Sequence, residues 1–235
     1  MLNIKNKKAV FFDFGDTLAS TVPTYPDRIR IALLEMGFEF SVQEYFSAFQ
    51  HADYQIYNNY IKDGEITSKI YQQSLFSIII DKLGINMEVE ETRQLVNKKM
   101  SSGMGLKRVL LPGAEELLRE VHSLGYTLAI ISNNDGKTAE KCAQVGIDKY
   151  FQIIIDSTKV NRIKPDRGIY LLASRELGID TNDIVHIGDL YGADVLGARN
   201  AGIETVWLNS RNGINYDGID VLEVESLQKI SELFK

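Results

Sequence analysis

The stretch AEELLREVHSLGYTLAIIS, residues 114–132, decides the fold of this chain. Its first half places apolar residues at helical spacing and ends at Gly125, a position where a left-handed helix cap favours glycine. Its second half contains an apolar run, residues 128–131, without the alternation of a half-exposed strand. The stretch therefore predicts a helix followed closely by a strand that is buried on both faces.

The same unit occurs four times between residues 114 and 208. In each copy an amphipathic helix ends at a glycine and a short β-rich run follows. The glycines are Gly125, Gly146, Gly178 and Gly202, and the runs are residues 128–131, 153–155, 184–187 and 205–208, with residues 8–12 as a fifth strand. Right-handed crossovers between such strands predict an α/β fold with a doubly wound, Rossmann-like parallel sheet.

Residues 20–107 break this rhythm, because they hold helical patterns and no strand comparable with those of the core. The patterns cover residues 27–36, 45–61, 67–83 and 88–100, and Ser101–Gly105 is interpreted as a flexible return to the core. The expected division is a core domain of residues 1–19 and 108–235 and an inserted helical domain of residues 20–107.

Composition narrows the class of partner. The chain has 26 Lys and Arg against 32 Asp and Glu, a formal charge of −6, and no basic block, so small molecules are expected rather than nucleic acid.

Cys142 is the only cysteine, which excludes an internal disulfide framework and a cysteine-rich metal site. No stretch approaches the roughly 20 apolar residues of a membrane span, and Asp13 interrupts the first apolar run. We expect a cytoplasmic monomer or homodimer without membrane contact, with export as the minor alternative.

Polar residues follow the predicted strands, at the edge of a parallel sheet where ligands bind. Carboxylates that converge there repel one another unless a cation neutralises them, and an all-oxygen site suits Mg²⁺. A lysine and hydroxyl groups suit the oxygens of a phosphoryl group. These strand ends hold Asp13 to Thr17, Ser132 to Asp135, Lys164, and Gly188-Asp189 with Asp194. Together they suggest Mg²⁺-dependent phosphoryl transfer.

In these residues the chain resembles the haloacid dehalogenase superfamily, and the resemblance covers most of its length. The four motifs of that superfamily appear in order. FFDFGDT (residues 11–17) resembles hhhDxDxT, residues 130–133 resemble hhhhS/T, Lys164 before Pro165 resembles the third motif, and residues 188–194 match GDxxxxD. The helical insert resembles the C1 cap, which closes over the crevice and selects the substrate.

The resemblance implies a metal site and a nucleophile. Asp13 would attack phosphorus and form an aspartyl phosphate that water later hydrolyses. Mg²⁺ would be held by Asp13, the backbone carbonyl of Gly15 and Asp189, with Asp194 orienting water or a ligand in the outer shell.

The resemblance also implies how the phosphate is bound. Lys164 would offset charge on the nucleophile and the phosphate. The hydroxyl of Ser132 and the N–H of Asn133 would bind phosphate oxygens, and Thr17 joins them as a predicted substrate-binding residue.

The first motif departs from the pattern of the family's phosphatases at Gly15, where a second aspartate is usual. That aspartate acts as general acid and base, worth about 10²- to 10⁴-fold. Three interpretations stay open. Asp16 acts as a displaced acid and base, or the leaving group has a low pKa and needs no acid, or catalysis is weakened or lost.

These interpretations correspond to different functions. The first choice is a Mg²⁺-dependent phosphohydrolase for a small phosphorylated metabolite, and the alternative is a phosphate- or metabolite-binding protein without turnover. Haloacid dehalogenase is the third choice. The dehalogenase branch typically has an aromatic residue at the position of Gly15 and lacks GDxxxxD, whereas this chain has the glycine and the motif.

Simpler explanations exist for single residues. Asp13 and Asp189 could be helix N-caps, and His186 inside an apolar strand fits a core residue. Arg28 and Arg30 could bind a second anionic group, but a surface helix explains them as well.

Overall fold

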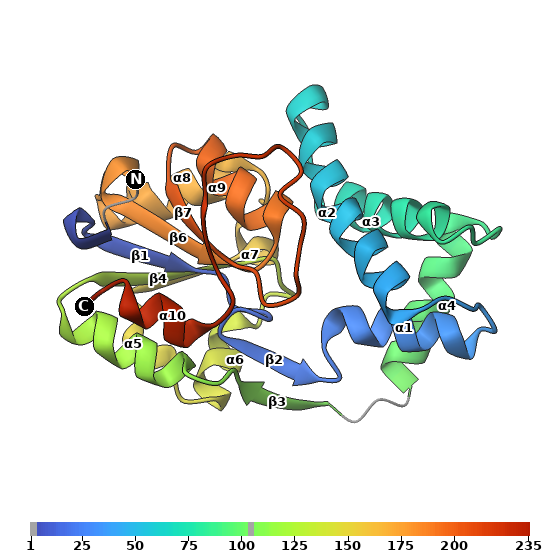
Figure 1. Ribbon diagram of the computed structural model, residues 1–235, viewed down its shortest axis with the longest axis horizontal. Helices are drawn as coiled ribbons and strands as arrows, with labels where there is room; N and C mark the ends of the chain where they lie inside the picture. Colours follow the sequence, from blue (N-terminus) through green and yellow to red (C-terminus); the bar gives the residue numbers. More distant parts are fainter. Residues whose placement is uncertain (1–3, 103–105) are drawn as a thin grey trace.

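A six-stranded parallel sheet forms the centre of the computed structural model, which describes residues 4–102 and 106–235. The strands stand in the order β5-β4-β1-β6-β7-β8, and every neighbouring pair is parallel. They are β1 (Ala9–Phe12), β4 (Thr127–Ser132), β5 (Ile153–Asp156), β6 (Ile184–Gly188), β7 (Glu204–Leu208) and β8 (Leu222–Val224). The expected doubly wound α/β fold is confirmed (Figure 1).

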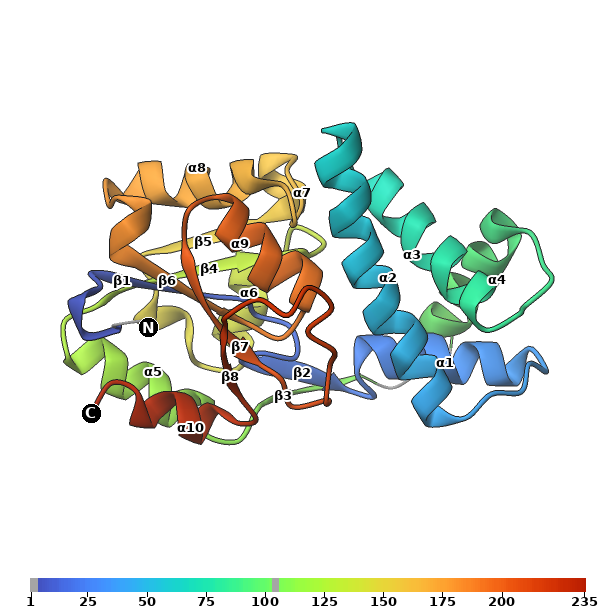
Figure 2. The same cartoon turned by 45° about the horizontal axis from the view of Figure 1, so that its top comes forward.

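Helices cover both faces of this sheet (Figure 2). In β1, Val10 and Phe12 pack into the core cluster under α5 and α10, whereas Ala9 and Phe11 pack into the cluster under α8 and α9. Both faces are therefore apolar, which explains the absence of alternation in the strand sequences. The helices are α5 (Ala114–Ser123), α6 (Thr138–Gln144), α7 (Ser157–Val160), α8 (Arg167–Leu177), α9 (Gly197–Asn200) and α10 (Leu227–Glu232).

Short irregular helices connect these elements. They are 3-10 turns at Ile4–Asn6, Asp148–Tyr150 and Thr181–Asp183, and a π-helix at Tyr191–Leu196 directly before α9. The four glycines predicted to end helices have φ between 66° and 87°, so each adopts the left-handed conformation that its position requires.

The five predicted core strands are present, and β8 is a sixth that the sequence analysis missed. It has three residues, of which Glu223 is exposed and Val224 is buried. A run this short shows no recognisable period, and only its pairing with β7 makes it a strand.

The predicted helices of the insert are confirmed close to their expected bounds, as α1 (Tyr25–Glu35), α2 (Val42–Asp63), α3 (Ser68–Lys82) and α4 (Val89–Ser102). They form an apolar cluster of their own, in which Ile29, Tyr45, Phe76 and Val96 are fully buried. Residues 103–105 of the segment interpreted as a flexible return lie outside the described residues. None of the helices in the described part of the chain is long and apolar enough to cross a membrane.

A two-stranded antiparallel ribbon at the ends of the insert corrects the expectation of a purely helical segment. β2 (Ala19–Val22) pairs with β3 (Lys107–Leu110). The two strands are far apart in the sequence and short, so no local pattern indicated them. The expected domain boundaries, after residues 19 and 107, fall inside this ribbon, which we propose as the junction between core and insert.

The insert also contacts the core through α2, which packs against the π-helix (Figure 2). The buried Asp53 carboxylate accepts the backbone N–H of Gly192 and, at 3.0 Å, that of Ala193. The backbones approach so closely that a Cβ at position 192 would lie 2.3 Å from the carbonyl oxygen of Asp53. Glycine at 192 is therefore required for this contact.

We expect Gly192→Ala to destabilise the protein by about 1–3 kcal/mol, because the new methyl group collides with backbone that cannot rotate away. Urea unfolding measures the change. Gly168→Ala on α8 is the matched control, because its Cβ would meet only side-chain atoms, chiefly the Arg162 guanidinium at 2.5 Å. Equal unfolding free energies for Gly192→Ala and the wild type would contradict the close contact.

Candidate active site

The carboxyl ends of three neighbouring strands bring the predicted site residues together. The strand order places β1 between β4 and β6, so Asp13 lies between Ser132 and Asp189. All three line one cavity of about 550 Å³, whose wall also includes residues of the insert helices α1 to α4. The crossover topology thus assembles residues more than a hundred positions apart.

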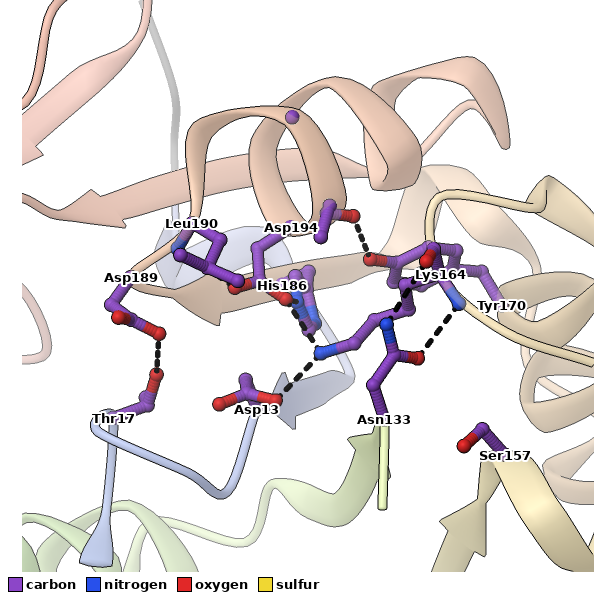
Figure 3. A network of polar contacts seen from close by, with 12 residues as sticks. Asp13, Thr17, Asn133, Ser157, Lys164, Tyr170, His186, Asp189, Leu190 and Asp194 are labelled. Atoms are coloured by element: carbon purple, nitrogen blue, oxygen red, sulfur yellow. Dashed lines mark hydrogen bonds and ion pairs between the residues drawn. The ribbon is translucent and has the colours of Figure 1, made fainter. Parts of the chain in front are cut away.

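Lys164 is the centre of a buried ion-pair network (Figure 3). Its ammonium group lies 2.6 Å from a carboxylate oxygen of Asp13 and 2.7 Å from one of Asp194, and Lys164 is only 2% exposed. The pKa of Lys164 is raised: burial opposes the charge, but the two carboxylates outweigh it. A lysine placed in this way stays protonated and neutralises the groups beside it.

Asn133 holds the backbone of Lys164 in place. Its side-chain amide donates to the Lys164 carbonyl oxygen at 2.9 Å, and its carbonyl oxygen accepts the Lys164 N–H at 2.8 Å. The side chain of Asn133 therefore positions the lysine, a role the sequence did not indicate, while Ser132 is buried and lines the cavity.

Asp194 accepts hydrogen bonds from three different residues. Besides Lys164 it contacts Nε2 of His186 at 3.2 Å and accepts the Leu190 N–H at 3.0 Å. Although burial alone would raise the pKa of Asp194, Lys164 and His186 together hold it well below its usual range. A carboxylate with these partners stays charged and supports its neighbours.

His186 is buried in β6, as expected for a core residue, but it belongs to this network. Burial lowers its pKa, and its Nδ1 has no hydrogen-bond partner in the described part of the chain. The ring also packs edge-on against Tyr170, with centroids 5.1 Å apart.

Three carboxylates form a candidate cation site. Oxygen atoms of Asp13, Asp189 and Asp194 all lie within 4.8 Å of one another. Burial raises the pKa of Asp13 to about 6 and that of Asp189 well above its usual range, although Lys164 and Arg211 oppose the two shifts. The carbonyl oxygen of Gly15 accepts no hydrogen bond from residues 4–102 and 106–235. This all-oxygen donor set fits Mg²⁺.

Arg211 is a site residue that the sequence analysis missed. Its guanidinium lies 3.0 Å from a carboxylate oxygen of Asp189 and 2.8 Å from one of Asp16. Arg211 follows β7, so the rule that ligand-binding residues follow strands would have found it if applied to this strand as well.

Asp16 lines the same cavity as Asp13, but its carboxylate is engaged elsewhere. One oxygen pairs with Arg211 and the other accepts the hydroxyl of Ser20. Its backbone is left-handed, with φ of 59°. At Gly15, in contrast, a Cβ would meet no atom within 4 Å, so the chain has space for a side chain there.

Thr17 is fully buried and donates its hydroxyl to Asp189 at 3.2 Å. It is absent from the cavity wall that the described residues form. The hydroxyl of Thr17 therefore contacts the candidate metal ligand Asp189 and does not line the cavity that a substrate would occupy, in contrast to the predicted substrate-binding role.

These features define an α/β protein whose strand ends carry a carboxylate–lysine site under a helical insert. The sequence model of the haloacid dehalogenase-like hydrolases matches residues 7–202. The chain belongs to this hydrolase family.

Two curated relatives cover nearly all of the chain. One is a glyceraldehyde 3-phosphate phosphatase of Methanothermobacter thermautotrophicus, 27% identical over 96% of this chain and 99% of the relative. The other is the pyrimidine 5'-nucleotidase YjjG of Escherichia coli, 28% identical over 95% of this chain and 96% of the relative. Among solved structures, an L-2-haloacid dehalogenase shares the fold with a TM-score of 0.65 and 18% identity, over 97% of this chain and 99% of that one.

We expect Lys164→Met to destabilise the protein by about 3–5 kcal/mol at pH 8 in the presence of a chelator, because it leaves two buried carboxylates without their cation. The free energy of unfolding that Lys164→Met loses relative to the wild type becomes smaller as the pH falls. The stability that Asp194 contributes through its lowered pKa is present above its unfolded pKa of about 3.9 and disappears in acid, and unpaired buried carboxylates also become neutral there. Urea unfolding between about pH 2 and pH 8 covers both effects, the neutralisation of the unpaired carboxylates and, below about pH 4, the loss of the Asp194 contribution.

Lys141→Met is the control for this experiment. Lys141 also lines the cavity and pairs with a carboxylate at 2.7 Å, but its partner Asp135 is exposed, so we expect a loss below about 1 kcal/mol. A Lys164→Met deficit that matched this control, or that did not change with pH, would show that the buried pairs do not support the fold.

Proposed function

We propose that the protein is a Mg²⁺-dependent phosphomonoesterase that acts on a small phosphorylated substrate, with Asp13 as the nucleophile. The observation that carries this proposal is the contact of Lys164 with Asp13 at the wall of a substrate-sized cavity, within reach of Asp189. The curated relatives support it, because both are named as enzymes that release phosphate from phosphate esters. The cytoplasmic location and the monomeric or homodimeric state stay predictions from the sequence.

The reaction divides into two displacements at phosphorus. A carboxylate oxygen of Asp13 attacks, the new oxygen–phosphorus bond forms, and the ester bond to the alcohol breaks. Water then attacks the aspartyl phosphate, so that inorganic phosphate leaves and the carboxylate is restored. Lys164 stabilises the charge on the phosphoryl oxygens, and the Ser132 hydroxyl and Asn133 N–H bind them. Asp13, Asp189 and the carbonyl oxygen of Gly15 would hold Mg²⁺, with Asp194 close by, and the ion would supply positive charge against that of the carboxylates and the phosphate.

The leaving alcohol needs a proton, and neither Gly15 nor Asp16 offers a free acid for it. Gly15 has no side chain, and both oxygens of Asp16 are occupied by Arg211 and Ser20. These contacts support the interpretation in which the leaving group departs without an acid over the one in which Asp16 is displaced into that role. We therefore propose a substrate whose leaving group has a low pKa.

We expect Asp13→Asn to lower phosphate release from 4-nitrophenyl phosphate by at least about a thousandfold, because an amide cannot form the covalent intermediate. Removal of Mg²⁺ with EDTA abolishes the wild-type activity. Asp183→Asn is the matched control, since Asp183 precedes β6 at the opposite end of the sheet and pairs with Lys8. Unchanged activity in Asp13→Asn would refute the proposed nucleophile.

A comparison of leaving groups tests the missing acid. We expect the wild type to hydrolyse aryl phosphates at least about a hundredfold faster than alkyl phosphates, and Gly15→Asp to narrow this gap, because the cavity has space for the new carboxyl group. Asp16→Asn should change both rates in parallel. A loss confined to alkyl phosphates in Asp16→Asn would instead identify Asp16 as the displaced acid.

A second candidate function rests on Gly15. A protein without a general acid could bind phosphorylated metabolites without hydrolysing them. The wild type would then show stable binding and no phosphate release, and Gly15→Asp would restore hydrolysis. Dehalogenation is the third candidate, because the fold is shared with a haloacid dehalogenase; halide release without added metal would favour it.

A further inference from the structure

Two arginines line the same cavity from the side of the insert. Arg28 lies on α1, and Arg108 lies on β3 of the ribbon that joins insert and core. Arg28 stands 5.6 Å from the ring centroid of Tyr25, and Arg108 stands 5.8 Å from that of Phe14. Aromatic rings of this kind hold a guanidinium in place but carry no compensating charge.

Neither guanidinium has an anionic partner among the residues that the structure describes. Over residues 4–102 and 106–235, Arg28 and Arg108 form no side-chain hydrogen bond or ion pair, and the Nε of each is buried without a partner. The other cations of the cavity wall differ from them. Each of these is paired with carboxylates: Lys164 with Asp13 and Asp194, Arg211 with Asp16 and Asp189, and Lys141 with Asp135.

The two arginines also repel each other. Burial lowers the pKa of Arg28 and the nearby charge of Arg108 lowers it further, against the opposing effects of Tyr25 and Asp16. Two partly desolvated like charges that face a cavity raise the energy of the empty site, and a bound anion would relieve that repulsion. The planar donors of arginine suit carboxylate and phosphate oxygens.

We propose that Arg28 and Arg108 form a subsite for a second anionic group of the substrate. The substrate class is then a phosphate ester whose leaving group carries a carboxylate or a second phosphate away from the reacting phosphorus. This inference rests on the proposed function, since the reacting phosphate is placed at Asp13 and Lys164. Recognition would need both the ribbon and the insert helix α1, because β3 and α1 each supply one arginine.

Three aryl phosphates with related leaving groups test this subsite: phenyl phosphate, 4-carboxyphenyl phosphate and 1,4-phenylene bisphosphate. We expect the wild type to prefer at least one of the doubly anionic compounds over phenyl phosphate by at least about tenfold in kcat/KM. Arg28→Gln and Arg108→Gln should each reduce that preference about tenfold, mainly through KM, and Arg28→Lys should restore part of it. The two doubly anionic compounds distinguish a carboxylate from a phosphate as the second group.

Arg30→Gln is the matched control, because Arg30 lies on the same helix and pairs with Asp27 at 3.3 Å. It should keep the wild-type preference. A wild type without preference, or a preference that survives in both glutamine variants, would overturn the subsite.

Calorimetric binding separates this failure from failure of the proposed function. If none of the three compounds is hydrolysed, the phosphomonoesterase proposal fails. The affinities of wild type and Arg28→Gln for 1,4-phenylene bisphosphate then still decide the subsite. Weaker binding to the variant supports it, and equal binding refutes it.

Discussion

The buried ammonium group of Lys164 is the interaction on which the site depends. Two carboxylates, Asp13 after β1 and Asp194 within the π-helix, are buried, and the free-energy cost of burying them is acceptable only because a cation lies between them. Asn133 and the donors around Asp194 serve the same arrangement, because they hold the lysine backbone and one of its partners. The charge that remains on Asp13 and Asp189 is what a divalent cation would balance.

The same segment that carries Asp194 also receives the insert. Asp53 on α2 accepts the N–H groups of Gly192 and Ala193, directly before Asp194 in the π-helix. A carboxylate at the backbone N–H groups of a helix start is electrostatically favourable. The contact with Asp53 and the site residue Asp194 belong to the same short π-helix. A movement of α2 against the core would therefore displace the backbone next to Asp194.

Around Gly15 the structure leaves space for a side chain, while the neighbouring carboxylate of Asp16 is already paired. The glycine leaves space and a carbonyl oxygen without a donor, while Asp16 is tied to Arg211 and Ser20. Arg211 in turn contacts Asp189, so it balances two carboxylates on different strands. The other cations of the cavity wall, Lys141, Lys164 and Arg211, are thus paired with carboxylates, whereas Arg28 and Arg108 form no ion pair within the described part of the chain.

The sequence by itself determined five of the six sheet strands, the helices of the insert and the order of the chemical groups at the strand ends. These features are local: a period of apolar residues, a glycine at a helix end, or a carboxylate after a strand is written in consecutive positions. It also placed Asp13, Lys164 and Asp189 at one edge, because parallel strands end together.

Only the tertiary structure decided which partner each group has. The ribbon of β2 and β3, the Asp53 contact and the pairing of Arg211 with Asp16 join residues that are distant in the chain, and no local period encodes them. Partner choice depends on burial and on competition between charges in three dimensions. For that reason only the fold shows that Arg28 and Arg108 form no ion pair with any described residue.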